Sequence, residues 1–185
     1  MSVKYKTGDD QLPHFITFSV VDWIDVLTRN EYKDILVESL KYCIREKGMR
    51  LNAWVIMTNH VHLIMSSKAG FKISDILRDL KKYTSKQIVK TIKESLIESR
   101  KVWMLYMFER AAKRNSNNKD FQFWQHDNHP IELSTPGMLK ERVDYLHENP
   151  VKAGIVSEPH HYVYGSAVDY YTNQQGRIMI EHLQC

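Results

Sequence analysis

The chain has 185 residues, of which 43% are hydrophobic, and this is enough to bury one core of ordinary size. No stretch approaches the roughly 18 apolar residues of a membrane-spanning helix, and the N-terminus lacks the apolar segment of a secretory signal. The two cysteines, Cys43 and Cys185, form no Cys-x-x-Cys pair, which argues against a disulfide framework or a thiolate zinc site. We expect one cytoplasmic domain over residues 1–185, with its core at about 12–171 and a C-terminal tail at 172–185.

The net charge of +4 is unevenly distributed along the chain. Residues 68–119 contain fourteen Lys and Arg against five Asp and Glu, whereas the rest of the chain has twelve basic and seventeen acidic residues. A solvated helix face usually mixes the two signs, so this segregation favours a polyanionic partner. A merely basic surface helix remains an alternative explanation of the charge.

The first half of the chain alternates strand and helix patterns. Residues 14–21 are β-branched and aromatic and predict a strand. A helix is expected over 31–47, between a cap at Asn30 and Gly48. Strands follow at about 50–57 and 61–66. Ser74 then begins a long helix with Ile76, Leu77, Leu80, Tyr83 and Ile88 facing inward, and the helical pattern continues through 95–112.

The second half begins with a polar loop over 114–120, followed by a last predicted strand at 121–126. A helix over 137–148 should end before Asn149, because the residue ahead of a proline disfavours helical geometry. The strand-like segment 177–180 either pairs at a sheet edge or contacts a partner. The order of elements predicts an α+β fold, a ferredoxin-like split βαβ antiparallel sheet with helices on one face.

His60 and His62 open the third predicted strand, inside the apolar run 54–65. Side chains alternate along a strand, so both imidazoles point to the same face, about 6.5–7 Å apart along the backbone. Two imidazoles at that spacing can share one divalent metal ion. For an isolated His-x-His, two histidines at a solvated face would be the simpler interpretation, but the apolar flanks indicate a central strand whose polar face needs a reason.

Tyr145 and Asn149 lie four residues apart in the last predicted helix and therefore share one of its faces. A tyrosine oxygen can attack phosphorus, and an amide oxygen can ligate a metal. Taken alone the pair is a weak signal, since a helical tyrosine is more often part of the core or the surface. Asp144 and His147 fall on other faces of the helix, so no general base is evident beside Tyr145.

Together these segments resemble one family, the REP-associated tyrosine transposases and their IS200-like relatives among the single-strand insertion-sequence transposases, which are HUH endonucleases. The resemblance spans about residues 12–171. Its ordered motifs are His60-Val61-His62, Phe123-Trp124-Gln125-His126, Val143-Asp144-Tyr145-Leu146-His147-Glu148-Asn149-Pro150-Val151-Lys152-Ala153-Gly154 and Tyr164-Gly165-Ser166-Ala167. The agreement of several motifs in order makes the resemblance specific, which His-x-His alone would not be.

The resemblance implies a DNA transposase that acts as a single-strand endonuclease and strand transferase. His60, His62 and Asn149 would hold Mg²⁺ or Mn²⁺, and Tyr145 would attack a phosphodiester to give a 5′-phosphotyrosine and a free 3′-OH. The family binds imperfect DNA hairpins and cuts a nearby single-stranded site, which also implies association with the bacterial nucleoid. Tyr83 is the rival nucleophile, although its spacing from Leu80 and Ile76 favours packing.

The expected DNA contacts are Lys81, Lys82, Lys86 and Lys90 for phosphates and Trp124 and His126 for an unpaired base. For Trp124, burial in the core ranks slightly ahead of stacking. Two other functions stay open: a derived protein that holds structured DNA or RNA without cutting it, and a metal-dependent phosphoesterase. Residues 63–66, Leu-Ile-Met-Ser, supply no further ligands and disfavour the phosphoesterase. A homodimer with tyrosines exchanged between subunits and a monomer are both compatible with the sequence.

Overall fold

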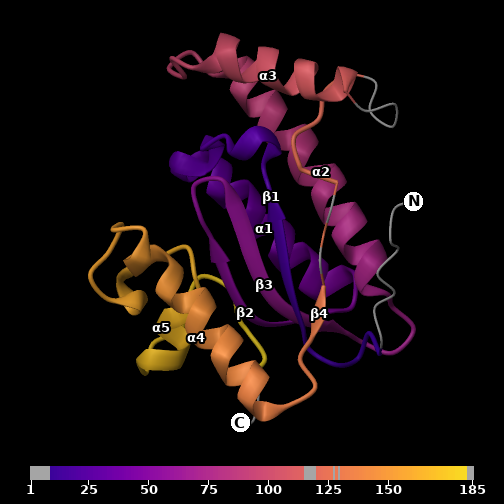
Figure 1. Ribbon diagram of the computed structural model, residues 1–185, viewed down its shortest axis with the longest axis vertical. Helices are drawn as coiled ribbons and strands as arrows, with labels where there is room; N and C mark the ends of the chain where they lie inside the picture. Colours follow the sequence, from indigo (N-terminus) through magenta and orange to yellow (C-terminus); the bar gives the residue numbers. More distant parts are fainter. Residues whose placement is uncertain (1–8, 115–119, 127, 129, 183–185) are drawn as a thin grey trace.

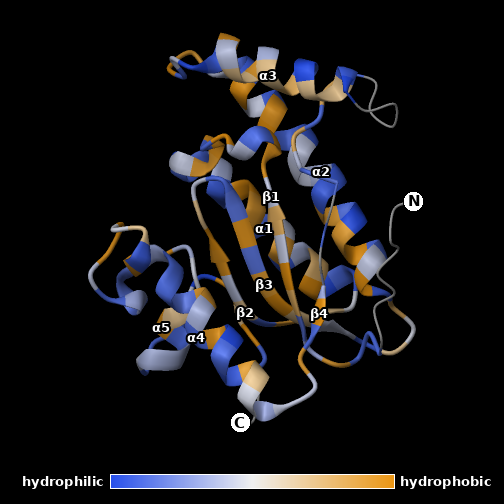
Figure 2. Cartoon of the chain, viewed as in Figure 1, coloured by the Kyte–Doolittle hydropathy of each residue, from blue (hydrophilic) through white to orange (hydrophobic). Residues whose placement is uncertain are grey.

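The computed structural model describes residues 9–114, 120–126, 128 and 130–182. Within these residues four strands form one antiparallel sheet in the order β2-β3-β1-β4 (Figure 1). The strands are β1 (His14–Ser19), β2 (Met49–Ile56), β3 (His60–Ser67) and β4 (Ile131–Glu132). Hydrophilic bands interrupt the otherwise largely hydrophobic β3 (Figure 2).

Helix α2 (Ile73–Glu94) packs on the face of the sheet that carries Phe18, since Trp124 contacts Phe18 with its ring and Thr84 of α2 with its indole N–H. Helix α1 (Asn30–Glu46) packs beside it, against α2 and β2 (Figure 1). Helix α4 (Pro136–Lys152) lies against β2 and β3 on the opposite face, followed by the short α5 (Ala167–Tyr171). The α+β class and the ferredoxin-like antiparallel sheet are confirmed. The second face is covered by α4 only in part, and His60 and His62 stand on it.

The predicted helical continuation from α2 is broken, and α3 (Lys101–Lys113) is a separate helix at one end of the molecule (Figure 1). Glu98 explains the break. Its carboxylate is buried and accepts hydrogen bonds from Arg29 Nε at 2.8 Å and from the Tyr32 hydroxyl at 3.2 Å. A long-range ion pair thus holds the linker against the start of α1, which local helix propensity does not anticipate.

The last predicted strand, 121–126, is also wrong as a regular element. Only an isolated bridge between Val20 and Trp124 forms there, and the fourth strand is β4, paired with His14 and Phe15. Phe123 and Trp124 are both buried and meet edge to face at 4.7 Å. Successive side chains of a strand point to opposite faces, so two neighbours in one core require an irregular backbone.

Helix α4 does not end before Asn149 but continues through Pro150 to Lys152. A proline inside a helix removes one backbone hydrogen bond, a smaller loss here because Pro150 is buried in the last turn. Downstream, the outer edge of β2 is covered: Tyr164 O accepts from Ile56 N, and Leu51 O accepts from Glu181 N. The tail therefore meets the sheet edge through residue 181, although 177–180 form no strand.

Candidate active site

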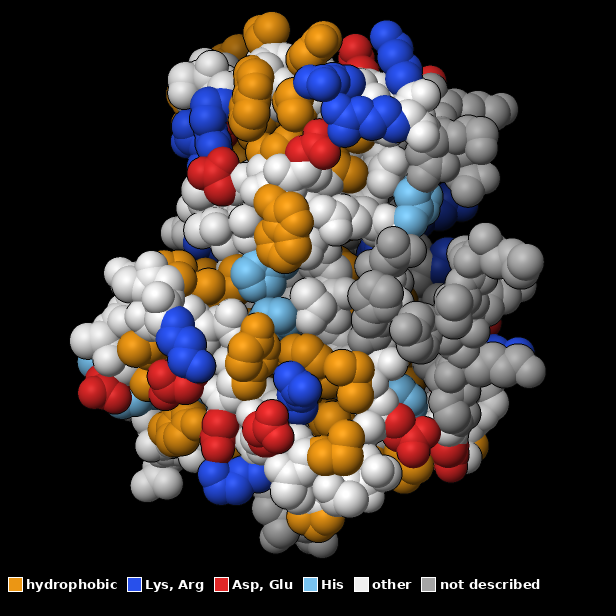
Figure 3. Space-filling view, viewed as in Figure 1, with side chains coloured by type: hydrophobic (Ala, Val, Ile, Leu, Met, Phe, Trp, Pro, Cys, Tyr) orange, Lys and Arg blue, Asp and Glu red, His pale blue; other side chains and the backbone are white. Residues whose placement is uncertain are grey.

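His60 and His62 lie side by side on the face of β3 opposite α1 and α2, with ring centroids 4.7 Å apart. Histidine side chains near the middle of the face shown in Figure 3 are flanked by hydrophobic side chains on two sides. Phe15 of β1 stacks on His62 at 5.3 Å. The period of the strand places the two imidazoles as the sequence predicted.

Asn59 fixes the orientation of the His60 ring. The Asn59 Nδ2 donates to the Trp23 carbonyl at 3.2 Å, so its Oδ1 faces His60 Nδ1 at 2.6 Å and accepts from it. The proton of neutral His60 therefore sits on Nδ1, and the lone pair is on Nε2. Burial lowers the pKa of His60, which favours this neutral form.

Thr17 plays the corresponding part for His62. It is paired with His62 across β1 and β3, and its hydroxyl lies 2.6 Å from His62 Nδ1. The buried Nε2 of His62 has no hydrogen-bond partner among the described residues. Burial, and secondarily the nearby His60, lowers the pKa of His62 to about 3, and the polar side chain of Asn149, close to the ring but outside hydrogen-bond geometry, acts in the opposite direction. A buried nitrogen without a partner, next to a second neutral imidazole, fits a metal ligand.

Tyr145 and Asn149 come to this face from α4. The Tyr145 ring lies 5.6 Å from the His62 ring and 5.9 Å from Phe15, and 39% of the residue is exposed. Asn149 Nδ2 donates to the Tyr145 carbonyl at 2.8 Å, which turns its Oδ1 away from the helix backbone. The tertiary structure thus brings His60, His62, Tyr145 and Asn149 together on one face.

The donor set fits a hard divalent ion with open positions. Two imidazole nitrogens and one amide oxygen are N and O donors, which leave room for water or phosphate oxygens. In the described part of the chain no cluster of three or more His, Cys, Asp or Glu side chains could hold a metal. Besides the two histidines, an ion bound here would take Asn149 and water or phosphate oxygens as ligands, rather than a third acidic or histidine side chain.

Five side chains around this site were not singled out from the sequence: Thr17, Trp23, Asn59, Arg142 and Lys152. The Arg142 guanidinium lies 6.0 Å, and the Lys152 ammonium 5.7 Å, from the centre of the Tyr145 ring. Their positions i−3 and i+7 relative to Tyr145 on the same helix are the signal that points to them. They bring positive charge to the Tyr145 side of the site.

Tyr83 is not part of this site. It lies on α2, on the other side of the sheet, and lines a groove between α1 and α2. The prediction that it packs inward is wrong, because 56% of Tyr83 is exposed and Thr84 takes the buried position in its turn.

His147 and Asp144 of α4 do not act as a base beside Tyr145. His147 is buried, with Nε2 2.8 Å from Ser166 Oγ, and burial lowers its pKa to about 4. Asp144 pairs with Lys140 at 2.6 Å.

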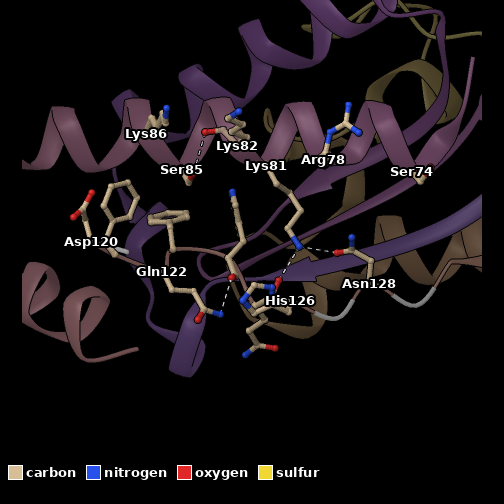
Figure 4. Close-up of a pocket in the computed structure, with 14 residues that line it drawn as sticks. Ser74, Arg78, Lys81, Lys82, Ser85, Lys86, Asp120, Gln122, His126 and Asn128 are labelled. Carbon is tan, nitrogen blue, oxygen red and sulfur yellow. Dashed lines mark hydrogen bonds between the residues drawn. The ribbon is translucent and has the colours of Figure 1, made fainter. Parts of the chain in front are cut away.

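All of the predicted DNA contacts except Lys90 line a groove between α2 and residues 120–126 and 128 (Figure 4). Lys82 and Lys86 are exposed and line this groove of about 520 Å³, and exposed His126 lies across from them. Lys81 donates to Gln125 O at 2.7 Å and to Asn128 Oδ1 at 2.9 Å, which holds the groove wall to α2.

Trp124 is 5% exposed, in line with the packing role that ranked first. Lys90 lies further along α2, 3.9 Å from Glu94.

Comparison with known proteins shows which family the chain resembles. Residues 14–120, more than half of the chain, match the family model described as IS200-like transposase. Among solved structures, a REP-associated tyrosine transposase bound to a REP hairpin aligns with a TM-score of 0.65 and 18% identity, covering 100% of this chain and 94% of that one. A putative transposase from Deinococcus radiodurans R1 aligns over 76% of this chain and 97% of its own, with a TM-score of 0.45 and 15% identity.

The matched segment includes β1 and both histidines but not α4, and at 18% identity the structural likeness shows a shared fold. No curated protein gives a significant match in sequence. In the described residues no helix is long and apolar enough to cross a membrane. From the family match and the shared fold together, the chain belongs to the IS200-like transposases.

Proposed function

We propose that the chain cleaves and rejoins single-stranded DNA through Tyr145. The phenol oxygen attacks the phosphorus of a phosphodiester lying at His60 and His62, and the P–O3′ bond breaks. The products are a 5′-phosphotyrosine and a 3′-OH, with the phenol proton released to water and the 3′ oxygen protonated in turn. The observation that supports this most directly is the 5.6 Å approach of the Tyr145 and His62 rings within one chain.

The side chains divide the work. His60 and His62, with Asn149, would hold Mg²⁺ or Mn²⁺, and such an ion supplies charge neutralisation and polarisation of the phosphate. Thr17 and Asn59 would hold the imidazole rings of His62 and His60 in their orientation through contacts to Nδ1. Arg142 and Lys152 offset the negative charge of a phosphate beside Tyr145. Because the phosphotyrosine keeps the phosphoester bond, attack by a 3′-OH rejoins a strand without ATP.

We further propose hairpin DNA as the partner, with the basic groove as the phosphate-binding surface. The structural neighbour was solved on a REP hairpin. Lys82 and Lys86 on the groove, and Lys90 beyond it, project from one helix among basic neighbours, which suits a polyanion. Lys81 contributes by holding the wall that carries His126. Trp124 supports that wall from the core rather than stacking on a base.

The test is a covalent adduct on a denaturing gel after incubation with Mn²⁺ and a hairpin with single-stranded extensions. The wild-type protein and the Tyr83→Phe variant should both form it, and Tyr145→Phe should form none while still binding the hairpin. An adduct that depends on Tyr83 would transfer the nucleophile to α2. Hairpin binding with no adduct in any variant would leave the non-cleaving DNA- or RNA-holding protein, and turnover of a plain phosphodiester without an adduct would favour a phosphoesterase.

A further inference from the structure

Trp23 is a large aromatic side chain exposed directly beside the histidine pair. Its indole ring lies 5.8 Å from the His60 ring, at an interplanar angle of 65°, and 56% of the residue is exposed. Two other tryptophans, Trp54 and Trp124, are 0% and 5% exposed. Trp103 on α3 is exposed as well, so what sets Trp23 apart is that its exposed ring lies against the histidine pair.

The backbone that presents Trp23 is held in an unfavourable conformation. Asp22 and Trp23 have φ of 51° and 55°, and they are the non-glycine residues with positive φ in the described part of the chain. Such values are uncommon for bulky side chains and persist only where surrounding contacts enforce them. Here Arg114 Nη1 pairs with Asp22 at 3.2 Å, and Trp23 N donates to Val20 O at 3.1 Å.

Asn59 connects this strained turn to the site. Its Nδ2 donates to the Trp23 carbonyl and its Oδ1 accepts from His60 Nδ1. One amide therefore ties the Trp23 backbone to the His60 ring, and the indole in turn meets that ring at 5.8 Å. A rigid, exposed aromatic face at a fixed distance from the phosphate site has the properties of a stacking platform for a base.

We propose that Trp23 stacks on the unpaired base next to the phosphodiester that lies at His60 and His62, and so places that phosphate in front of Tyr145. This rests on the proposed function and adds a nucleotide-positioning residue to it. Stacking accepts every base, since each has a π-face, so Trp23 would hold the strand while the base edges are read elsewhere. An exposed tryptophan on α3, Trp103 at 48%, provides the matched control.

Binding is measured by fluorescence anisotropy in a Tyr145→Phe background, which separates it from cleavage. The probe is a labelled DNA hairpin with single-stranded extensions, chosen from a randomised pool as the tightest binder. Trp23→Ala should weaken binding by about 5- to 150-fold, the range found for base–aromatic stacking, while Trp23→Phe should retain most of the affinity. Trp103→Ala should have no effect. An abasic nucleotide at one position of the extension should weaken DNA binding by the protein that has Trp23 but not by the Trp23→Ala variant.

The proposal is overturned if Trp23→Ala binds as tightly as its parent, or if no abasic position loses its effect in Trp23→Ala. If Trp23 had only a structural role, replacing it would lower the melting temperature of the protein. Under our proposal, Trp23→Gly should leave the melting temperature unchanged or raise it, because glycine tolerates φ of 55°. Wild-type protein that forms no adduct but shows the abasic dependence would sink the proposed cleavage and leave the stacking intact. An adduct without that dependence would sink the stacking alone.

Discussion

Tyr145 of α4 and His62 of β3 face each other within one chain, with ring centroids 5.6 Å apart and an interplanar angle of 70°. Phe15 fills the space beside both rings, since it stacks on His62 and meets Tyr145 edge on. Tyr145 and the histidine pair are therefore neighbours without any exchange of segments between subunits. For the proposed cleavage this favours an arrangement in cis, with the whole site built from one copy of the chain.

Mixing two inactive variants tests the cis arrangement. Tyr145→Phe lacks the proposed nucleophile and His62→Ala lacks a proposed metal ligand, so a mixture of them should form no covalent adduct with hairpin DNA if each site is built from one chain. Adduct formation on mixing, at a level above either variant alone, would show that a homodimer shares tyrosines between subunits. Sedimentation of the mixture gives the oligomeric state in the same samples.

Thr17 and Asn59 should matter for metal binding although neither is a ligand. Thr17→Val removes the group that orients His62 Nδ1, and loss of such a supporting hydrogen bond commonly costs about 10- to 100-fold in metal affinity. Paramagnetic resonance of Mn²⁺ measures that affinity without any cleavage. Thr17→Ser keeps the hydroxyl and is the control. Equal affinities for the two variants would contradict the supporting role.

Lys82 and Lys86 should set the salt dependence of DNA binding. Each phosphate contact to a single strand contributes about 0.7, and to a duplex about 0.9, to the slope of log affinity against log salt. Lys82→Gln/Lys86→Gln should therefore flatten the slope by about 1.4–1.8. Lys41→Gln, an exposed lysine on α1, should leave it unchanged. An unaltered slope in the double variant would place the phosphates elsewhere.

Glu98 should make the fold sensitive to acid. Burial raises the pKa of Glu98, but hydrogen bonds from the Arg100 backbone, Arg29 and Tyr32 outweigh it and hold that pKa below its ordinary value. A lowered pKa in the folded state stabilises above the unfolded value, and this stabilisation is lost as the pH falls through the folded value.

Glu98→Gln should accordingly lower the free energy of unfolding by about 1–3 kcal/mol at neutral pH, and the difference from wild type should shrink in acid. Denaturant unfolding at a series of pH values measures both effects. Glu94→Gln is the control, because Glu94 is exposed and lies 3.9 Å from Lys90. A constant difference at every pH would show that the charge of Glu98 is not what stabilises the linker.

Local periodicity predicted the residue pairs of the candidate site because backbone geometry determines them. The two-residue period of a strand puts His60 and His62 on one face, and the helical repeat does the same for Tyr145 and Asn149. The helix that carries Tyr145 is longer than predicted: Pro150 lies buried in its last turn, and the helix continues through it. The predicted inward orientation of Tyr83 is wrong because the helical period allows either Tyr83 or Thr84 to face inward. The hydrogen bond from Trp124 to Thr84 selects Thr84.

The sequence by itself determined which residues share a strand face or a helix face, and that basic residues gather in one stretch of the chain. The tertiary structure alone decided that α4 crosses the open side of the sheet so that Tyr145 reaches His62, and that a strained turn brings Trp23 to His60. Those contacts join segments far apart in the chain. They depend on side-chain packing and on hydrogen bonds such as that from Asn59 to Trp23, which no short-range pattern encodes.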